Sequence, residues 1–236
     1  MERILKQLVD KLTQAYGGDL VSVVLYGSAA VGDHHGRFSD INVFCVLKQV
    51  TSRELRRAEP IFRWWRDHGN PSPLLMGEEE VPRSTDCFPI EFHDIQARHR
   101  ILYGADVVSG LAIDDVFYRA EIEHELRAKL LRLRQKAGGL LSDRDLLLRL
   151  MVESVSTFGT LFRHALVLAG FEAKWQKRDV FQDAAEKFGI DAAPFLTLLD
   201  IREEKVKPRS VDPFRLFDDY LAQIQTVIAA VDRLDR

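Results

Sequence analysis

The segment VSVVLYGSAAVGDHHGRFSDINVFCVL, residues 21–47, decides the fold of the N-terminal half of the chain. Its first part, Val21 to Tyr26, is short, apolar and rich in β-branched residues, which predicts a buried strand. Gly27 and Ser28 follow, where the chain must turn sharply. A strand that runs into such a turn and then into a short helical segment leaves backbone N–H groups pointing outward. That geometry suits a phosphate group.

A second apolar strand is predicted from Asp40 to Leu47, after a loop rich in Gly and His. Side chains alternate between the two faces of a strand, so Asp40 and Asn42 project to the same face. Two polar oxygen donors at the start of an otherwise apolar strand are costly to bury unless something binds them. We expect that partner to be a divalent metal that carries the phosphates of a nucleotide.

The turn Gly27-Ser28 and the acid Asp40 resemble the signature of the nucleotidyltransferases of the DNA polymerase β superfamily. The resemblance is strongest to small bacterial members related to the aminoglycoside nucleotidyltransferases. Their signature is a strand, Gly-Ser, a short loop, then Asp-x-Asp or Asp-x-Glu on the next strand, and a third carboxylate on a later strand. Asn42 stands where the family has its second metal-binding acid, so we expect weaker metal binding.

Glu91 is the expected third carboxylate. Residues 87–92, CFPIEF, alternate between apolar and other side chains, which predicts a strand with Glu91 on the face opposite the apolar one. If this strand lies beside that of Asp40, Glu91 completes a carboxylate cluster; on the outside of an edge strand it is an exposed acid. Asp94 is the alternative, because a shifted strand register would present it instead.

The resemblance implies a role for each of these positions. Asp40 and Glu91 are expected to act in catalysis, and the expected ligands of Mg²⁺ are Asp40, Asn42 and Glu91. The nucleotide is expected to contact Gly27, Ser28 and Arg37, although Arg37 fits a plain surface charge equally well. Neighbouring loop histidines usually point apart, so we interpret His34-His35 as solvated residues and not as metal ligands.

Helical patterns surround the strands of the N-terminal half. Apolar residues at helical spacing over residues 2–16 predict a helix that covers one face of the sheet. The capping box Thr51-Ser-Arg-Glu54 begins another helix, which Pro60 is expected to kink or break. Residues 94–104 are predicted to form a short helix that ends at Gly104, and their Leu-Tyr-Gly ending also resembles the family.

The C-terminal half shows no strand pattern and predicts an all-α bundle. Its amphipathic segments predict helices at residues 114–137, 142–169, 179–188, 191–204 and from 212 onward. We therefore expect a nucleotidyltransferase domain with a mixed sheet, of α/β (α+β) class, at residues 1–110, and a helical domain at residues 111–236. Such a helical partner resembles the group termed HEPN-like.

Composition limits the partners. A net charge of -3 gives no overall attraction to nucleic acid, which is therefore not an expected partner. Cys45 and Cys87 lie in apolar runs without metal-ligand spacing, so we expect buried thiols. The first residues are charged, and no apolar run is long enough for a membrane span. These features predict a cytoplasmic protein that does not enter a membrane.

The resemblance implies transfer of a nucleoside monophosphate, with AMP as the first choice, from a Mg²⁺-bound NTP such as ATP to an acceptor hydroxyl. Two alternatives remain: a nucleotide-binding or regulatory module that has lost activity, or an antitoxin-like protein that acts on a protein or RNA partner. The acceptor, a small molecule or a protein, is not identified by the sequence. A homodimer is a further possibility.

Overall fold

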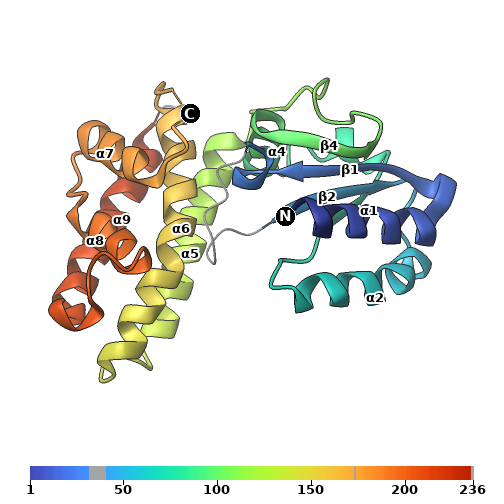
Figure 1. Cartoon of the computed structure of the whole chain (residues 1–236). Coiled ribbons are helices and arrows are strands. Elements are labelled where there is room, and N and C mark those ends of the chain that lie inside the picture. The colour runs from blue at the N-terminus through green and yellow to red at the C-terminus, as the bar shows by residue number, and fades with distance from the viewer. Residues whose placement is uncertain (32–40, 173, 235–236) are drawn as a thin grey trace. The chain divides into compact units, whose positions relative to one another are not determined.

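The computed structural model describes residues 1–31, 41–172 and 174–234. The chain divides into two compact units, Met1–Phe117 and Tyr118–Arg236, and each is described here by itself. Figure 1 shows strands with helices in the first unit and helices in the second. The predicted fold class, an α/β N-terminal domain with a mixed sheet followed by an all-α bundle, is confirmed.

The N-terminal unit is built on a four-stranded sheet with the order β3-β2-β1-β4. Its strands are β1 (Leu20–Tyr26), β2 (Asn42–Leu47), β3 (Leu74–Gly77) and β4 (His99–Gly104). β1 pairs antiparallel with β2 and with β4, whereas β2 pairs parallel with β3. The register places Tyr26 opposite Asn42 on one side and opposite His99 on the other. These three residues therefore mark one end of the sheet.

One face of the sheet is covered by α1 (Glu2–Tyr16) and α2 (Ser52–Asp67), which lie along it in Figure 1. The core beneath them is apolar and fully buried, and it includes Leu8, Val23, Leu25, Cys45 and Trp65. Both bonds of the predicted capping box at the start of α2 are present. α2 continues through Pro60 without the break that the sequence suggests.

The other face of the sheet is covered by α4 (Pro89–Ala97) and the short α3 (Glu80–Arg83). Phe92 and Ile95 of α4 are buried against Val24 and Phe44 of the sheet. The rings of Phe44 and Phe92 meet edge to face with their centroids 6.4 Å apart. This contact fixes the beginning of α4 over β2.

The predicted strand at residues 87–92 is wrong, and of the helix predicted at residues 94–104 only residues 94–97 are helical, as the end of α4. Helix α4 begins at Pro89, because proline needs no N–H partner at the first helical position and its φ already suits a helix. The helix ends at Ala97, and β4 follows because it can pair with β1 along its length. Cys45 is buried as expected, whereas Cys87 lies exposed before α4.

The C-terminal unit is a helical bundle, as predicted. Its helices are α5 (Tyr118–Ala137), α6 (Arg144–Leu168), α7 (Lys177–Phe188), α8 (Ala193–Arg202) and α9 (Pro213–Arg233), and the 3₁₀ turn η4 (Pro208–Ser210) precedes α9. α6 contacts the other four, around a cluster of edge-to-face and stacked rings formed by Phe158, Phe162, Phe181, Phe195 and Tyr220. The sequence therefore predicts this unit well, because each helix shows its own apolar stripe.

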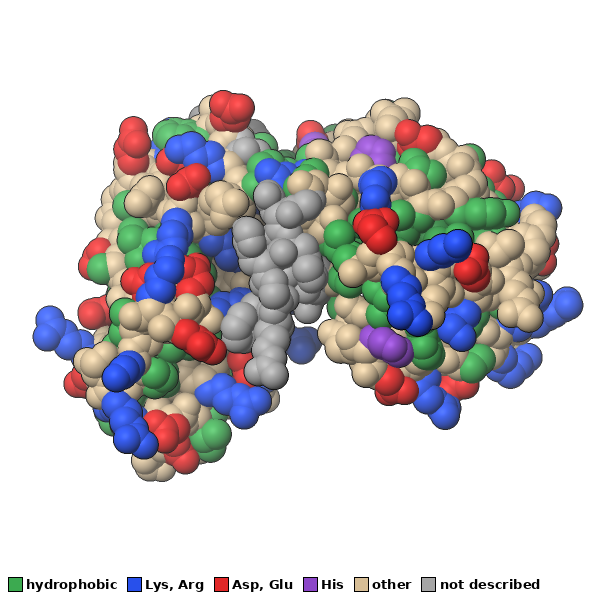
Figure 2. Space-filling model, viewed as in Figure 1, with side chains coloured by type: hydrophobic (Ala, Val, Ile, Leu, Met, Phe, Trp, Pro, Cys, Tyr) green, Lys and Arg blue, Asp and Glu red, His purple; other side chains and the backbone are tan. Residues whose placement is uncertain are grey.

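The surface of both units mixes the two signs of charge. Figure 2 shows Lys and Arg side chains interspersed with Asp and Glu side chains on the visible face. On α5, Lys129 and Glu125 form an ion pair one helical turn apart, with Nζ to Oε2 at 3.0 Å. None of the helices in the described ranges combines the length and the apolar character that crossing a bilayer requires.

Candidate active site

The sharp turn after β1 forms one side of the candidate site. Gly27 has a φ of 76°, in the left-handed region that glycine adopts without strain. Its N–H donates to the carbonyl oxygen of Arg98 at 2.9 Å, and its own carbonyl oxygen accepts from Ala30 N–H at 3.1 Å. Ser28 begins the 3₁₀ turn η2 (Ser28–Val31). The turn is thereby tied to the junction between α4 and β4.

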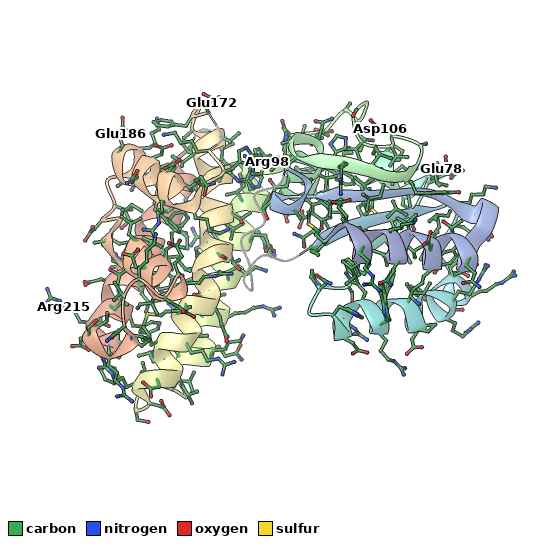
Figure 3. All side chains as sticks on the ribbon, in the orientation of Figure 1. Glu78, Arg98, Asp106, Glu172, Glu186 and Arg215 are labelled. Carbon is green, nitrogen blue, oxygen red and sulfur yellow. The ribbon has the colours of Figure 1, made fainter. Side chains whose placement is uncertain are left out.

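Figure 3 shows which end of the sheet this is. The labelled Arg98 lies near the end of β1, whereas the labelled Glu78 and Asp106 lie toward the opposite end of the strands. Asp106 holds a local turn there, because its carboxylate accepts from Ser109 Oγ at 2.6 Å and from two backbone N–H groups. These hydrogen bonds lower the pKa of Asp106 to about 2. This acid is already satisfied and lies away from Gly27.

Asn42 is the first residue of β2 and is half-buried. A Cβ atom placed on Gly27 would lie 3.5 Å from Nδ2 of Asn42, so the turn and the amide are direct neighbours. Along β2, Asn42 shares its face with Phe44, because side chains of a strand alternate. The amide therefore lies on the face that α4 covers, at the end nearest the Gly27 turn.

Glu91 lies in the first turn of α4 and is exposed. The next residue, Phe92, packs on Phe44, and Phe44 follows Asn42 by two residues on the same strand face. Two residues of strand span only about 6.6 Å. The first turn of α4 consequently lies over the part of the sheet that carries Asn42, although it arrives there from a helix and not from the predicted strand.

Tyr26 connects these groups. Burial, with a smaller contribution from the negative charges of Glu91 and Asp94, raises the pKa of its phenol to about 12. Since Coulomb interactions weaken with distance, both carboxylates lie in the neighbourhood of the Tyr26 phenol. The N-terminal dipole of α4 favours a carboxylate at Glu91. The sequence alone does not single out Tyr26; the available signal is its position directly before Gly27.

Two predicted site residues, Asp40 and Arg37, lie outside the described residues, as do His34 and His35, which we interpret as solvated loop residues. The structure therefore brings together Gly27, Ser28, Asn42 and the beginning of α4. The position of Asp40 is given by the sequence alone, two residues before Asn42.

The side-chain oxygen atoms at this end of the sheet are of the type that binds hard cations. Within residues 1–31, 41–172 and 174–234, no three His, Cys, Asp or Glu side chains converge closely enough to hold a metal ion. What the described chain offers is the amide oxygen of Asn42 and the carboxylates of Glu91 and Asp94. Oxygen ligands of this type are those that Mg²⁺ prefers. The donor set fits Mg²⁺ chemically.

Comparison with known proteins adds two findings. A family model described as "Nucleotidyltransferase domain" matches residues 5–136, more than half of the chain. Among solved structures, the chain is similar to the spectinomycin adenyltransferase AAD(9) from Enterococcus faecialis, crystallised with ATP and spectinomycin. The TM-score is 0.59 at 12% sequence identity, covering 98% of this chain and 99% of that chain, so the likeness concerns the fold. No curated protein matches the sequence.

Proposed function

Because the chain belongs to the nucleotidyltransferase domain family, we propose that it transfers a nucleoside monophosphate from an NTP to a hydroxyl group of an acceptor. ATP as donor, and hence AMP as the transferred group, is supported by the ATP in the similar adenyltransferase structure. The spectinomycin in that structure supports a small molecule as acceptor. We expect the reaction in the cytoplasm, where ATP and Mg²⁺ are available.

One observation carries the proposal: the Gly27 turn, Asn42 and the first turn of α4 meet at one end of the sheet. We assign Gly27 and Ser28 to the outer phosphates of the NTP, because backbone N–H groups at such a turn attract anions. Arg37 is proposed to add a positive charge from the adjoining loop.

We assign the metal to Asp40, Asn42 and Glu91. Mg²⁺, when bound, neutralises charge on the triphosphate and on the leaving group. Asn42 contributes a neutral carbonyl oxygen in place of a carboxylate, so it holds the cation less tightly than an aspartate would. Glu91 adds charge from the helix side of the site.

The transfer replaces one phosphorus–oxygen bond of the α-phosphate with another. The acceptor oxygen attacks the α-phosphorus, a new P–O bond forms, and the bond from that phosphorus to its bridging oxygen breaks. Pyrophosphate leaves with the electron pair of the broken bond, and Glu91 takes the proton of the hydroxyl. Positioning and electrostatic stabilisation supply most of the rate enhancement in such reactions.

The test is incubation of the purified protein with ATP labelled at the α-phosphate, Mg²⁺ and a panel of hydroxylated small molecules that includes spectinomycin. We expect Mg²⁺-dependent label transfer to at least one acceptor and release of pyrophosphate. Asp40→Ala is the control and should abolish both. Label transfer that persists unchanged in Asp40→Ala, or in the presence of EDTA, would contradict the assignment.

A second candidate function is a nucleotide-binding module without turnover, and Asn42 is the observation that favours it. In that case ATP with Mg²⁺ raises the melting temperature, since a ligand that binds only the native state stabilises it, but no pyrophosphate appears. Absence of any nucleotide-dependent shift would instead favour an interaction role, such as the antitoxin-like one.

A further inference from the structure

α1 and α2 lie side by side over the face of the sheet that α4 does not cover (Figure 1). The two helices run antiparallel, because the Tyr16 hydroxyl at the end of α1 donates to the carbonyl oxygen of Glu54 near the start of α2, at 2.8 Å, and Lys11 lies over the ring of Trp64. Between them the surface has an open hollow of about 260 Å³. This α1–α2 hollow is lined by Lys11, Gln14, Ala15, Arg57, Pro60 and Ile61.

Two cations, one from each helix, line the hollow, and aromatic rings hold both of them in place. The Nζ atom of Lys11 is 5.0 Å from the ring centroid of Trp64, and the Cζ atom of Arg57 is 5.1 Å from that of Tyr16. Arg57 also donates to the carbonyl oxygen of Ala15. Contacts of these kinds position the two side chains without neutralising their charges.

Acids of the chain compensate these two charges only weakly. Among the described residues, the only carboxylate that forms an ion pair with either cation is that of Asp19. Its Oδ2 atom lies 3.9 Å from Nη1 of Arg57, too far for a hydrogen bond, and Asp19 is exposed to water. The guanidinium has further N–H donors besides the one that Ala15 accepts. An anion can therefore interact with both cations.

The helices around the hollow are basic, although the chain as a whole is acidic. α1 and α2 carry eight Lys and Arg residues, three in α1 and five in α2, and five Asp and Glu residues, of which Glu54 is buried in the capping box. The whole chain has 33 basic and 36 acidic residues. A local excess of positive charge attracts an acidic partner and raises its association rate. This layer of helices therefore favours a negatively charged partner.

We infer that the α1–α2 hollow is a docking site for an acidic segment of a partner protein, with one carboxylate of that segment between Lys11 and Arg57. A neighbouring apolar side chain of the segment packs on Ala15, Pro60 and Ile61, because removal of apolar surface from water is favourable. Small-molecule sites have volumes of roughly 300–1,000 Å³, so this smaller, open hollow suits one or two side chains of a peptide.

Nucleic acid fits this surface less well than an acidic peptide does. Base stacking needs an accessible aromatic face, and the ring of Trp64 is already in contact with Lys11 and with His68, whose ring centroid is 4.8 Å away. The inference does not depend on the proposed function, because the candidate active site lies on the face of the sheet that α4 covers.

The probe is a short fluorescein-labelled peptide that alternates glutamate with leucine, and fluorescence anisotropy follows its binding to the full chain. A peptide that alternates glutamine with leucine has the same apolar groups without the charge. We expect the acidic peptide to bind about tenfold more tightly than the glutamine peptide, since two cations face its carboxylates. Added salt should weaken binding of the acidic peptide, because it screens exposed charges.

Lys11→Gln and Arg57→Gln should each weaken binding of the acidic peptide about three- to fivefold, the size expected for one exposed ion pair. Lys6→Gln is the matched control, because it removes the same charge from the same helix at an exposed position that does not line the hollow. It should leave binding unchanged. If Arg57→Gln does not fold for lack of its bond to Ala15, Lys11→Glu carries the test and should weaken binding more than Lys11→Gln.

Ala15→Leu tests the hollow itself. Leucine fills the space and leaves the charge unchanged, so the acidic peptide should bind about tenfold more weakly. The double variant Lys11→Glu/Arg57→Glu should lose the acidic peptide and bind a peptide that alternates lysine with leucine, because the charge complementarity is reversed.

The inference is overturned if the acidic peptide does not bind, or binds no more tightly than the glutamine peptide. It is also overturned if Lys6→Gln weakens binding as much as Lys11→Gln, or if Ala15→Leu binds as the wild type does. A single-stranded oligonucleotide that binds more tightly than the acidic peptide would assign this surface to nucleic acid instead. Glu91→Gln, on the other face, should bind the acidic peptide normally, so the proposed function stands or falls separately.

Discussion

The two faces of the same sheet are used differently. Beneath α1 and α2, Val23 and Cys45 are completely buried under Trp65, and this face packs apolar side chains along the whole strand. Beneath α4 the packing stops before the strands end, at the half-buried Tyr26 and Asn42. One face holds the strands in place, which leaves the end of the other face available for polar groups. Substitutions on the first face should therefore affect stability, and substitutions at the end of the second should affect ligands.

The largest effect is expected for Trp65→Ala. Removal of this fully buried ring from beneath α2 should lower the free energy of unfolding by about 3–5 kcal/mol, which urea titration measures. Trp65→Phe is the matched control. Within the described residues the indole N–H finds no hydrogen-bond partner, so phenylalanine keeps much of the packing and removes a buried polar group. A loss for Trp65→Phe as large as that for Trp65→Ala would contradict this reading of the first face.

Glu91→Gln should have the opposite effect: it should lower activity and leave the stability almost unchanged. As base and metal ligand, its removal should lower kcat/KM by about 100-fold, or ~2.7 kcal/mol in transition-state stabilisation. Since Glu91 is exposed, the free energy of unfolding should change by no more than ~0.5 kcal/mol. Steady-state kinetics and urea titration of the same sample decide this. Loss of stability with unchanged kinetics would mean that the two faces do not divide their tasks in this way.

The sequence predicts the elements whose structure depends on local patterns, and it fails where the structure depends on contacts with distant residues. β1, β2, α1 and the helices of the C-terminal unit carry their own patterns of apolar residues, and they form where those patterns predict. The capping box at Thr51 is likewise a local signal, and both of its bonds form.

The segment from Cys87 to Gly104 is different, because its structure depends on distant partners. The alternation around Glu91 predicts a strand, but Pro89 suits the first turn of a helix, and Phe92 finds its contact on Phe44 in β2. β4 exists because β1 offers it a free edge, which no local pattern reveals. The sequence thus indicates Glu91 as a candidate without predicting the helix that positions it, and its signal for Tyr26 is limited to the position of that residue directly before Gly27.

For Asn42→Asp, at the end of the second face, we expect an effect of intermediate size. A new carboxylate on β2 should tighten Mg²⁺ binding about tenfold, or ~1.4 kcal/mol, because the cation gains a charged ligand. In metal-free buffer the same carboxylate lies near Glu91 and Asp94, where like charges raise carboxyl pKa values and lower stability. Calorimetric Mg²⁺ titration and melting with and without EDTA measure the two effects. If melting is independent of metal in both proteins, Asn42 does not face a cation.

The smallest expected effect is a change in the pKa of Tyr26, which tests only whether Glu91 lies near this phenol. In Glu91→Gln the pKa of Tyr26 should fall below the wild-type value of about 12, because one of the negative charges that disfavour the phenolate is gone. It should stay above the ordinary value of 10, since burial is the larger cause. Carbon-13 NMR of labelled tyrosine rings follows this titration, with Tyr26→Phe to assign the signal.

The sign of the linked stability change follows from the same shift. A phenol whose pKa is higher in the folded state stabilises the fold fully below its unfolded pKa of 10, and this contribution is lost as the pH rises through about 12. In Glu91→Gln the loss should be complete at a lower pH. A Tyr26 pKa that is the same in the wild type, Glu91→Gln and Asp94→Asn would separate α4 from the Asn42 end of the sheet. Because the measurement needs neither metal nor nucleotide, it locates the first turns of α4 relative to β1 whether or not the protein is an active transferase.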